Sequence, residues 1–158
     1  MRLARIISGG QTGVDLAALD AALAAGFPCG GWVPHGRFNE DGPLDPRYPV
    51  QETDSRKLAR RTEWNVRDAD ATLILSRGAL GGGSALTQRL ARRYAKPCLH
   101  VDLTAVSPDA ALARIARWLD EIDGAVLNIA GPRASNDPEI YALARRVVET
   151  LLAARAGD

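Results

Sequence analysis

The residues best placed for chemistry in this sequence are the glycines near its start. The segment SGGQTGVDLAALDAAL follows an apolar run at residues 3–7 and leads into a helical pattern that begins at Val14. Glycines let a backbone approach an anion closely, and the N–H groups and dipole of a helix N-terminus attract negative charge. A tight turn capped by Thr12 or Asp15 is the alternative. The ligand-binding residues predicted in this turn are Gly9, Gly10, Gln11, Thr12 and Gly13.

A second glycine run repeats this arrangement further along the chain. It follows the apolar run at residues 71–75 and precedes a helical pattern that contains Leu86 and Leu90. Two such loops on adjacent strands would face each other and hold a phosphorylated ligand between their N–H groups. A flexible turn with Ser84 as the helix N-cap is the alternative. The predicted ligand-binding residues here are Gly81, Gly82, Gly83, Ser84 and Thr87.

A third loop, in LNIAGPRASNDPEIY, places Arg133 and Ser135 after another apolar run. The planar guanidinium of Arg133 can bind phosphate or carboxylate through two N–H groups, although hydrogen bonds to loop carbonyls would suit it equally. Asp15 would repel a bare anion. We therefore expect Asp15 either to stabilise the first helical turn or to accept a hydrogen bond from a ribose or pterin donor or hold a hydrated cation.

A long Pro- and Gly-rich insertion at residues 34–54 is predicted to form a wall over the site. Its His35 and Arg37 are added to the predicted ligand-binding residues because imidazole and guanidinium groups suit a heteroaromatic ring. Trp32 would either stack on such a ring or be buried. The sequence has no GxSxG elbow, so no catalytic residue is assigned.

The elements that must position these residues alternate between strands and helices. Helical patterns separate the strands and indicate a parallel sheet covered on both faces. We therefore predict an α/β, Rossmann-like three-layer α/β/α fold with strand order 2-1-3-4-5, the ligand lying at the carboxyl ends of strands one and three. Residues 1–158 are expected to form a single domain. The predicted strands are residues 3–8, 29–33, 71–75, 97–101 and 125–129.

Composition excludes several classes of partner. The 20 Lys and Arg residues nearly balance 19 Asp and Glu residues, so we expect neither nucleic acid nor membrane binding. Cys29 and Cys98 lack metal-site spacing and are predicted to be buried thiols, without a structural metal. No secretory signal or membrane span is visible, which predicts a cytoplasmic protein. The repeated arginine pairs on helices are expected to be solvated, and the exceptions in that part of the chain are Arg61, Thr62 and Asn65.

Five ordered blocks resemble the molybdenum carrier (molybdenum cofactor carrier-like) family. The resemblance extends roughly from Ile6 to Tyr141. It implies a Rossmann-like fold, a homo-oligomer (dimer or tetramer), and binding of the molybdenum cofactor, a pterin with a terminal phosphate, or of a related nucleotide-like ligand. The blocks are SGGQTGVDLAALDAAL, GGWVPHGRFNEDG, RRTEWNVRDADATLIL, GGGSALT and LNIAGPRAS.

The chain is also similar to the lysine-decarboxylase-like phosphoribohydrolases, which carry PGGxGTxxE after the corresponding strand. Alignment of the glycines puts Thr87 where those hydrolases have the Glu. Threonine cannot act as an acid or base near neutral pH, so hydrolysis would need another carboxylate, such as Glu52 or Asp15. The favoured hypothesis is a carrier without obligatory chemistry, and the alternative is a nucleotide N-glycosidase or phosphohydrolase.

Overall fold

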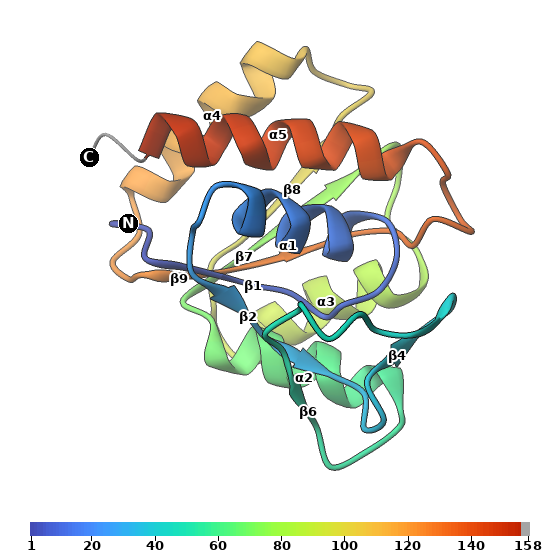
Figure 1. Cartoon of the computed structure of the whole chain (residues 1–158). Coiled ribbons are helices and arrows are strands. Elements are labelled where there is room, and N and C mark those ends of the chain that lie inside the picture. The colour runs from blue at the N-terminus through green and yellow to red at the C-terminus, as the bar shows by residue number, and fades with distance from the viewer. Residues whose placement is uncertain (156–158) are drawn as a thin grey trace.

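A five-stranded parallel sheet forms the middle layer of the computed structural model, which describes residues 1–155 (Figure 1). Every neighbouring pair in the sheet is parallel, and all six residues of the strand 71–76 are buried. The predicted α/β class and parallel sheet are therefore confirmed. Across the sheet, the strands run in the order β2 (Cys29–Gly30), β1 (Arg5–Ile7), β9 (Val126–Ala130), β7 (Ala71–Ser76) and β8 (Cys98–Asp102).

The order of the strands differs from the predicted 2-1-3-4-5. The last strand, β9, lies between β1 and β7, because Leu127 is registered against Ile6 on one side and Ala71 on the other. In chain order the sheet therefore runs 2-1-5-3-4. If β9 is counted as the first strand instead of the last, the same sheet becomes 3-2-1-4-5, the order of the classical doubly wound fold.

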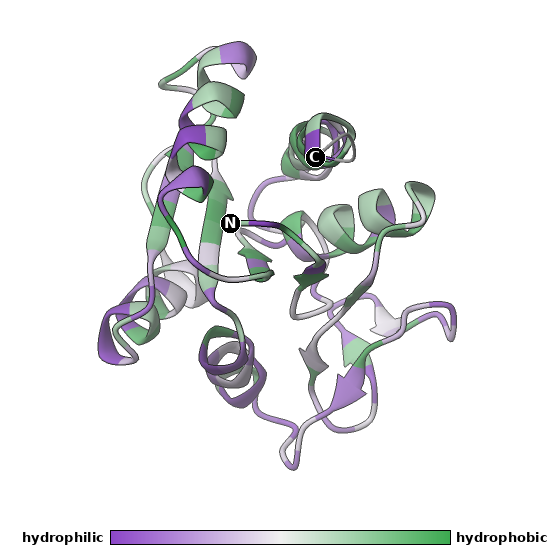
Figure 2. Ribbon diagram, turned by 90° about the vertical axis from the view of Figure 1, so that its left-hand side faces the viewer, coloured by the Kyte–Doolittle hydropathy of each residue, from purple (hydrophilic) through white to green (hydrophobic). Residues whose placement is uncertain are grey.

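Helices cover both faces of the sheet. Figure 1 shows α1 (Val14–Ala24), α4 (Pro108–Asp120) and α5 (Ile140–Arg155) above the sheet, with α2 (Leu58–Asp68) and α3 (Gly82–Arg93) below it. The view turned by 90° separates the same layers (Figure 2). The helices α1 and α3 fall where the sequence predicts helical patterns after the two glycine runs.

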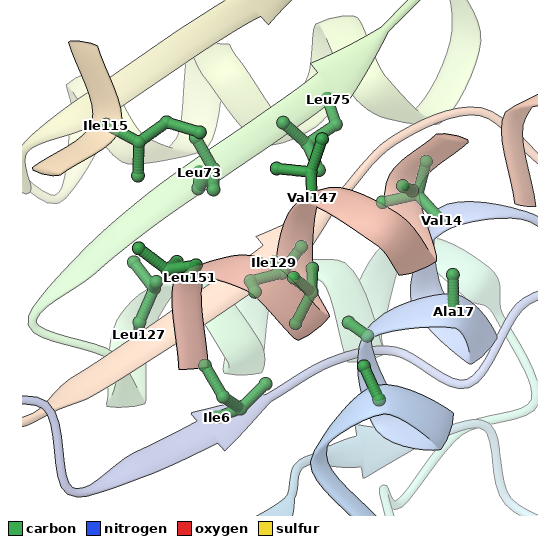
Figure 3. Packing of buried hydrophobic residues seen from close by; sticks show 14 of the residues in the cluster. Ile6, Val14, Ala17, Leu73, Leu75, Ile115, Leu127, Ile129, Val147 and Leu151 are labelled. Atoms are coloured by element: carbon green, nitrogen blue, oxygen red, sulfur yellow. The ribbon is translucent and has the colours of Figure 1, made fainter. Parts of the chain in front are cut away.

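The main core lies between the sheet and the upper helices. Figure 3 shows Ile6, Leu127 and Ile129 of the strands packed against Val147 and Leu151 of α5. Four alanines of α1 are fully buried, and their small side chains let α1 pack closely on α5. This packing fixes the start of α1, and with it the first glycine turn, relative to β9. The four alanines are Ala17, Ala18, Ala21 and Ala22.

The insertion at residues 34–54 has structure of its own. It contains an antiparallel hairpin of β4 (Phe38–Asn39) and β5 (Gly42–Pro43), while β6 (Gln51–Glu52) pairs with β3 (Trp32–Val33). Its apolar side chains form a second cluster with Leu19 of α1. The insertion is thus anchored on the helix that carries the first glycine turn.

Two further expectations concern the cysteines and membrane spans. Cys29 and Cys98 are free but half-buried, rather than fully buried as predicted, and their burial still raises the pKa of both thiols. Each lies on an outer strand of the sheet, which the helices cover less completely than the central strands. No helix among residues 1–155 is long and apolar enough to cross a membrane.

The strand order predicts that the chain tolerates a new start before β9. Arg155 donates a hydrogen bond of 3.2 Å from Nη1 to the Met1 carbonyl, so the two ends of the described chain lie close together. A variant with its ends joined by a short linker and opened between Ile122 and Asp123 should keep the native circular dichroism spectrum and unfold cooperatively. Loss of the cooperative transition would contradict this topological account.

Candidate ligand-binding cleft

A cleft of about 440 Å³ opens where the loops after β1, β7 and β9 meet, and the first half of α2 forms its remaining wall. The helices that follow β7 and β9, α3 and α5, lie on opposite faces of the sheet, and a crevice forms between two such strands. The cleft brings together eight residues predicted from the sequence. They are Gln11, Asp15, Gly81, Gly82, Gly83, Ser84, Thr87 and Arg133.

Glycines allow the three loops to approach one another. A Cβ atom at Gly13 would lie 2.3 Å from the carbonyl oxygen of Pro132, and one at Gly131 would lie 2.2 Å from that of Leu75. Val14 N–H also donates to Pro132 across this contact, at 3.2 Å. A side chain at either glycine would force the loops apart. These two glycines therefore serve packing between the loops.

Two N–H groups of the first glycine turn, those of Gln11 and Thr12, donate to neighbouring side chains. Gln11 N–H donates to Asp15 Oδ2, and Thr12 N–H donates to Gln11 Oε1, both at 3.1 Å. Gly10 has a positive φ of 74°, and a Cβ there would lie 2.8 Å from Val33 Cγ1 of β3. Of the five residues predicted in this turn, only Gln11 lines the cleft; Gly9, Gly10, Thr12 and Gly13 do not. Asp15 takes the place of the expected anion by accepting an N–H from the turn.

The second glycine run presents an open helix N-terminus to the cleft. Gly81 is the N-cap of α3, rather than Ser84, and no side chain caps this end. Cβ atoms at Gly81, Gly82 and Gly83 would meet nothing within 4 Å. Within the part of the chain that is described, the first-turn N–H groups and the Ser84 hydroxyl donate no hydrogen bond, although Ser84 is only 6% exposed. Thr87 donates its hydroxyl proton to the Gly83 carbonyl, at 2.8 Å.

Two arginines supply positive charge to the cleft. Arg133 makes no ion pair or side-chain hydrogen bond with residues 1–155, so its guanidinium is not consumed by loop carbonyls. Arg61 of α2 has a buried Nε without a hydrogen-bond partner in the same range. The two guanidinium groups are near enough for Arg133 to contribute to a lowered pKa of Arg61, which burial causes in the first place.

Asp15 faces Arg61 inside the cleft. Its side chain is buried, and Oδ2 lies 3.8 Å from Arg61 Nη1. Burial raises the pKa of Asp15, while the charge of Arg61 and the hydrogen bond from Gln11 act in the opposite direction. The separation is too long for a close ion pair. Arg61 is therefore only partly neutralised by the protein and keeps N–H groups for a ligand.

A third arginine in the wall is fully engaged by the protein. Arg77 binds Asp137 through two hydrogen bonds of 2.7 and 2.9 Å, and its Nη1 lies 2.7 Å from Glu139 Oε2. These bonds hold the pKa of Asp137 below its usual range. The triad joins the loop after β7 to the start of α5. It closes one end of the cleft and leaves Arg77 no free charge.

The remaining predicted residues lie outside the cleft lining. His35 is exposed, with Nδ1 3.9 Å from Glu52 Oε1, and neither side chain lines the cleft. Arg37 donates to three carbonyls of the insertion and so shapes that loop. Ser135 donates its N–H to Glu40, at 3.2 Å. Trp32 lies against Trp64, with ring centroids 4.8 Å apart.

The wall formed by α2 is the part that the sequence patterns locate least well. Leu58, Ala59, Arg61 and Thr62 line the cleft, although the apolar pattern of this helix is weak. The only signal is an arginine pair followed by Thr62 in a segment that leads directly to the second glycine run. Among the residues described, no group of three His, Cys, Asp or Glu side chains could hold a metal ion.

Comparison with known proteins agrees with this architecture. The sequence model of the circularly permutated YpsA SLOG family matches residues 6–152. The chain belongs to this family. When β9 is counted first, the sheet runs 3-2-1-4-5, the order that a doubly wound sheet would have if its first strand had moved to the end of the chain. No curated protein matches the chain.

A solved structure is similar over almost the whole chain. It is the crystal structure of a protein named putative molybdenum carrier protein, from Syntrophus aciditrophicus. The two chains share 50% sequence identity, each is covered over 96% of its length, and the TM-score is 0.93. The carrier-like family resemblance of the sequence blocks is thereby confirmed.

The buried pair predicts a pH-dependent cost of removing Arg61. Without Arg61, the folded pKa of Asp15 rises further above the unfolded value of about 3.9. Below that value the carboxyl group of Asp15 is neutral in both the folded and the unfolded protein, so its burial as a charged group does not lower stability. The free energy of unfolding then falls as the pH rises through the folded pKa. Urea unfolding should therefore show that Arg61→Met lowers the free energy of unfolding by about 3 kcal/mol at pH 8 and by less at pH 5. Equal losses at both pH values, or no rescue of the pH 8 loss by adding Asp15→Asn, would contradict this.

Proposed function

We propose that the protein is a binding or carrier protein for a phosphorylated pterin, such as the molybdenum cofactor, or for a related nucleotide-like ligand. The observation that carries the proposal is the set of unused donors around one cleft. The start of α3 offers N–H groups without an acceptor, and the guanidinium groups of Arg61 and Arg133 face the same space. A phosphate, with its several acceptor oxygens, is the ligand group that such donors bind best.

The size and walls of the cleft support a ligand larger than phosphate alone. A volume of about 440 Å³ is within the ordinary range for small-molecule sites. Leu58 and Ala59 of α2 and Leu86 of α3 add apolar surface beside the donors. A planar heterocycle would lie against these side chains while its phosphate binds at the start of α3.

The name of the similar Syntrophus aciditrophicus protein supports molybdenum cofactor as the cargo. A molybdenum atom carried within this cofactor keeps the sulfur ligands of its pterin dithiolene and needs no cysteine from the protein. The finer choice among phosphorylated pterins and nucleotides is part of the proposal. Guanosine monophosphate is a suitable probe because guanine contains the same 2-amino-4-oxopyrimidine ring as a pterin.

Titration with guanosine monophosphate by calorimetry tests the role of Arg133. Arg133→Met removes a charged donor, so affinity should fall about 10- to 100-fold. The matched control is Arg146→Met, which removes an exposed arginine of α5 that lines no part of the cleft and should leave affinity unchanged. Equal affinities of the Arg133 variant and the wild type would remove this residue from the site.

Gly83→Ala tests the amide cradle without damage to the fold. The added methyl group meets no protein atom and favours the helix, so thermal stability should be equal to or above that of the wild type. The same methyl group stands over the first turn of α3, and affinity for guanosine monophosphate should fall at least about tenfold. Undiminished binding by a stable Gly83→Ala protein would contradict an anion site at this helix.

Nucleotide hydrolysis is the rival function, and Asp15 is the specific observation in its favour. Asp15 lines the cleft, and its burial raises the pKa of the carboxyl group toward the range of a general acid. Incubation with nucleoside monophosphates distinguishes the two functions. Release of base or phosphate that Asp15→Asn abolishes would favour catalysis, whereas saturable binding without turnover would favour the carrier.

A further inference from the structure

Gln11 is held in one orientation by two backbone donors. Its Oε1 accepts N–H groups from Thr12, at 3.1 Å, and from Glu40 in the β4–β5 hairpin, at 3.0 Å. Because backbone N–H groups can only donate, the atom that accepts both must be the amide oxygen. The other end of the side chain is therefore the NH₂ group.

This NH₂ group has no partner in the described protein. Gln11 is only 7% exposed and lines the cleft, yet Nε2 donates no hydrogen bond to any of residues 1–155. Arg61 Nε, and not Gln11 Nε2, is the enclosed side-chain atom without a partner among residues 1–155, so Nε2 is open to the cleft, where an acceptor of a ligand can reach it. The group is thus an additional donor in a cleft that already contains the start of α3 and two arginines.

We propose that Gln11 binds the anionic group of the ligand through Nε2, and that the β4–β5 hairpin positions it for this purpose. The inference rests on the proposed function, since it assigns a specific donor to the same ligand. It also gives the insertion a defined role. The hairpin contacts the ligand site through Gln11 rather than covering the ligand with His35 or Arg37.

The hairpin is tied to the glycine turn by its own side chains. Asn39 Nδ2 donates to the Gly10 carbonyl, at 3.0 Å. The Glu40 carboxylate accepts a hydrogen bond from the Thr12 hydroxyl and another from Ser135 N–H, the latter at 3.2 Å. Glu40 therefore joins the first and third loops and fixes the position of its own N–H on Gln11. It is a positioning residue that acts through Gln11.

Gln11→Glu is the sharpest test because it preserves shape and one hydrogen-bonding end. One carboxylate oxygen can still accept from Thr12 and Glu40, while the second replaces the NH₂ group and brings an acceptor with negative charge to the ligand. Affinity for guanosine monophosphate should fall about 30- to 100-fold. Gln51→Glu, an exposed change of the same type outside the cleft, should leave affinity within about twofold.

A double-mutant cycle with Glu40→Ala tests the positioning role. Loss of the Glu40 side chain frees the hairpin and should weaken binding about tenfold, even though Gln11 is unchanged. In this background the additional effect of Gln11→Glu should shrink, because the amide is no longer held toward the ligand. Independent structural effects would instead multiply. Thermal unfolding of each variant monitors the fold, and Glu40→Ala supplies a separate test if Gln11→Glu does not fold.

The outcomes separate this inference from the proposed function. If the wild-type protein binds guanosine monophosphate and Gln11→Glu binds it with the same affinity, the role of Gln11 is overturned and the proposed function stands. Fully multiplicative effects in the cycle overturn the positioning role of Glu40. Absence of binding by the wild-type protein contradicts the proposed function, and this inference falls with it.

Discussion

The close approach of three loops at one edge of the sheet is the constraint on which the site depends. Because β9 lies between β1 and β7, the loop after β9 must fit between the two glycine runs. The loops can approach this closely only where no side chain separates their backbones. A Cβ atom at Gly13 or Gly131 would lie within 2.3 Å of a carbonyl oxygen. Some glycines that resemble a phosphate cradle therefore serve the assembly of the loops, and the anion site arises beside them.

The distribution of hydrogen bonds gives the cleft its chemical character. Within residues 1–155, two acceptor atoms near the first turn already receive backbone N–H groups: Asp15 Oδ2 from Gln11, and Gln11 Oε1 from Thr12 and Glu40. Asp137 is likewise engaged by Arg77. The unused groups are mainly donors, at the start of α3, on Arg61 and Arg133, and on Gln11. A cleft whose N–H groups remain free to donate after the internal hydrogen bonds are formed favours an anionic ligand.

Local patterns predicted much of this architecture, and long-range packing decided the rest. The helical patterns after the two glycine runs located α1 and α3, and the second glycine run and Arg133 lie at the cleft. The strand order could not be read from the sequence, because the apolar run at 125–129 would suit either a central or an outer strand. Likewise, the glycine spacing could not show that the amides of Gln11 and Thr12 would be consumed by neighbouring side chains. Arg61 was hard to assign because its helix contains few apolar residues, so the pattern did not show which face lies toward the cleft.

The central claim is that this cleft binds the phosphate of its ligand at the start of α3. The most direct measurement is a crystal structure of the protein in complex with guanosine monophosphate. The account predicts phosphate oxygens within hydrogen-bonding distance of the Gly83 or Ser84 N–H group and of the Arg133 guanidinium. A phosphate that points into solvent, or a nucleotide bound at another surface, would contradict it.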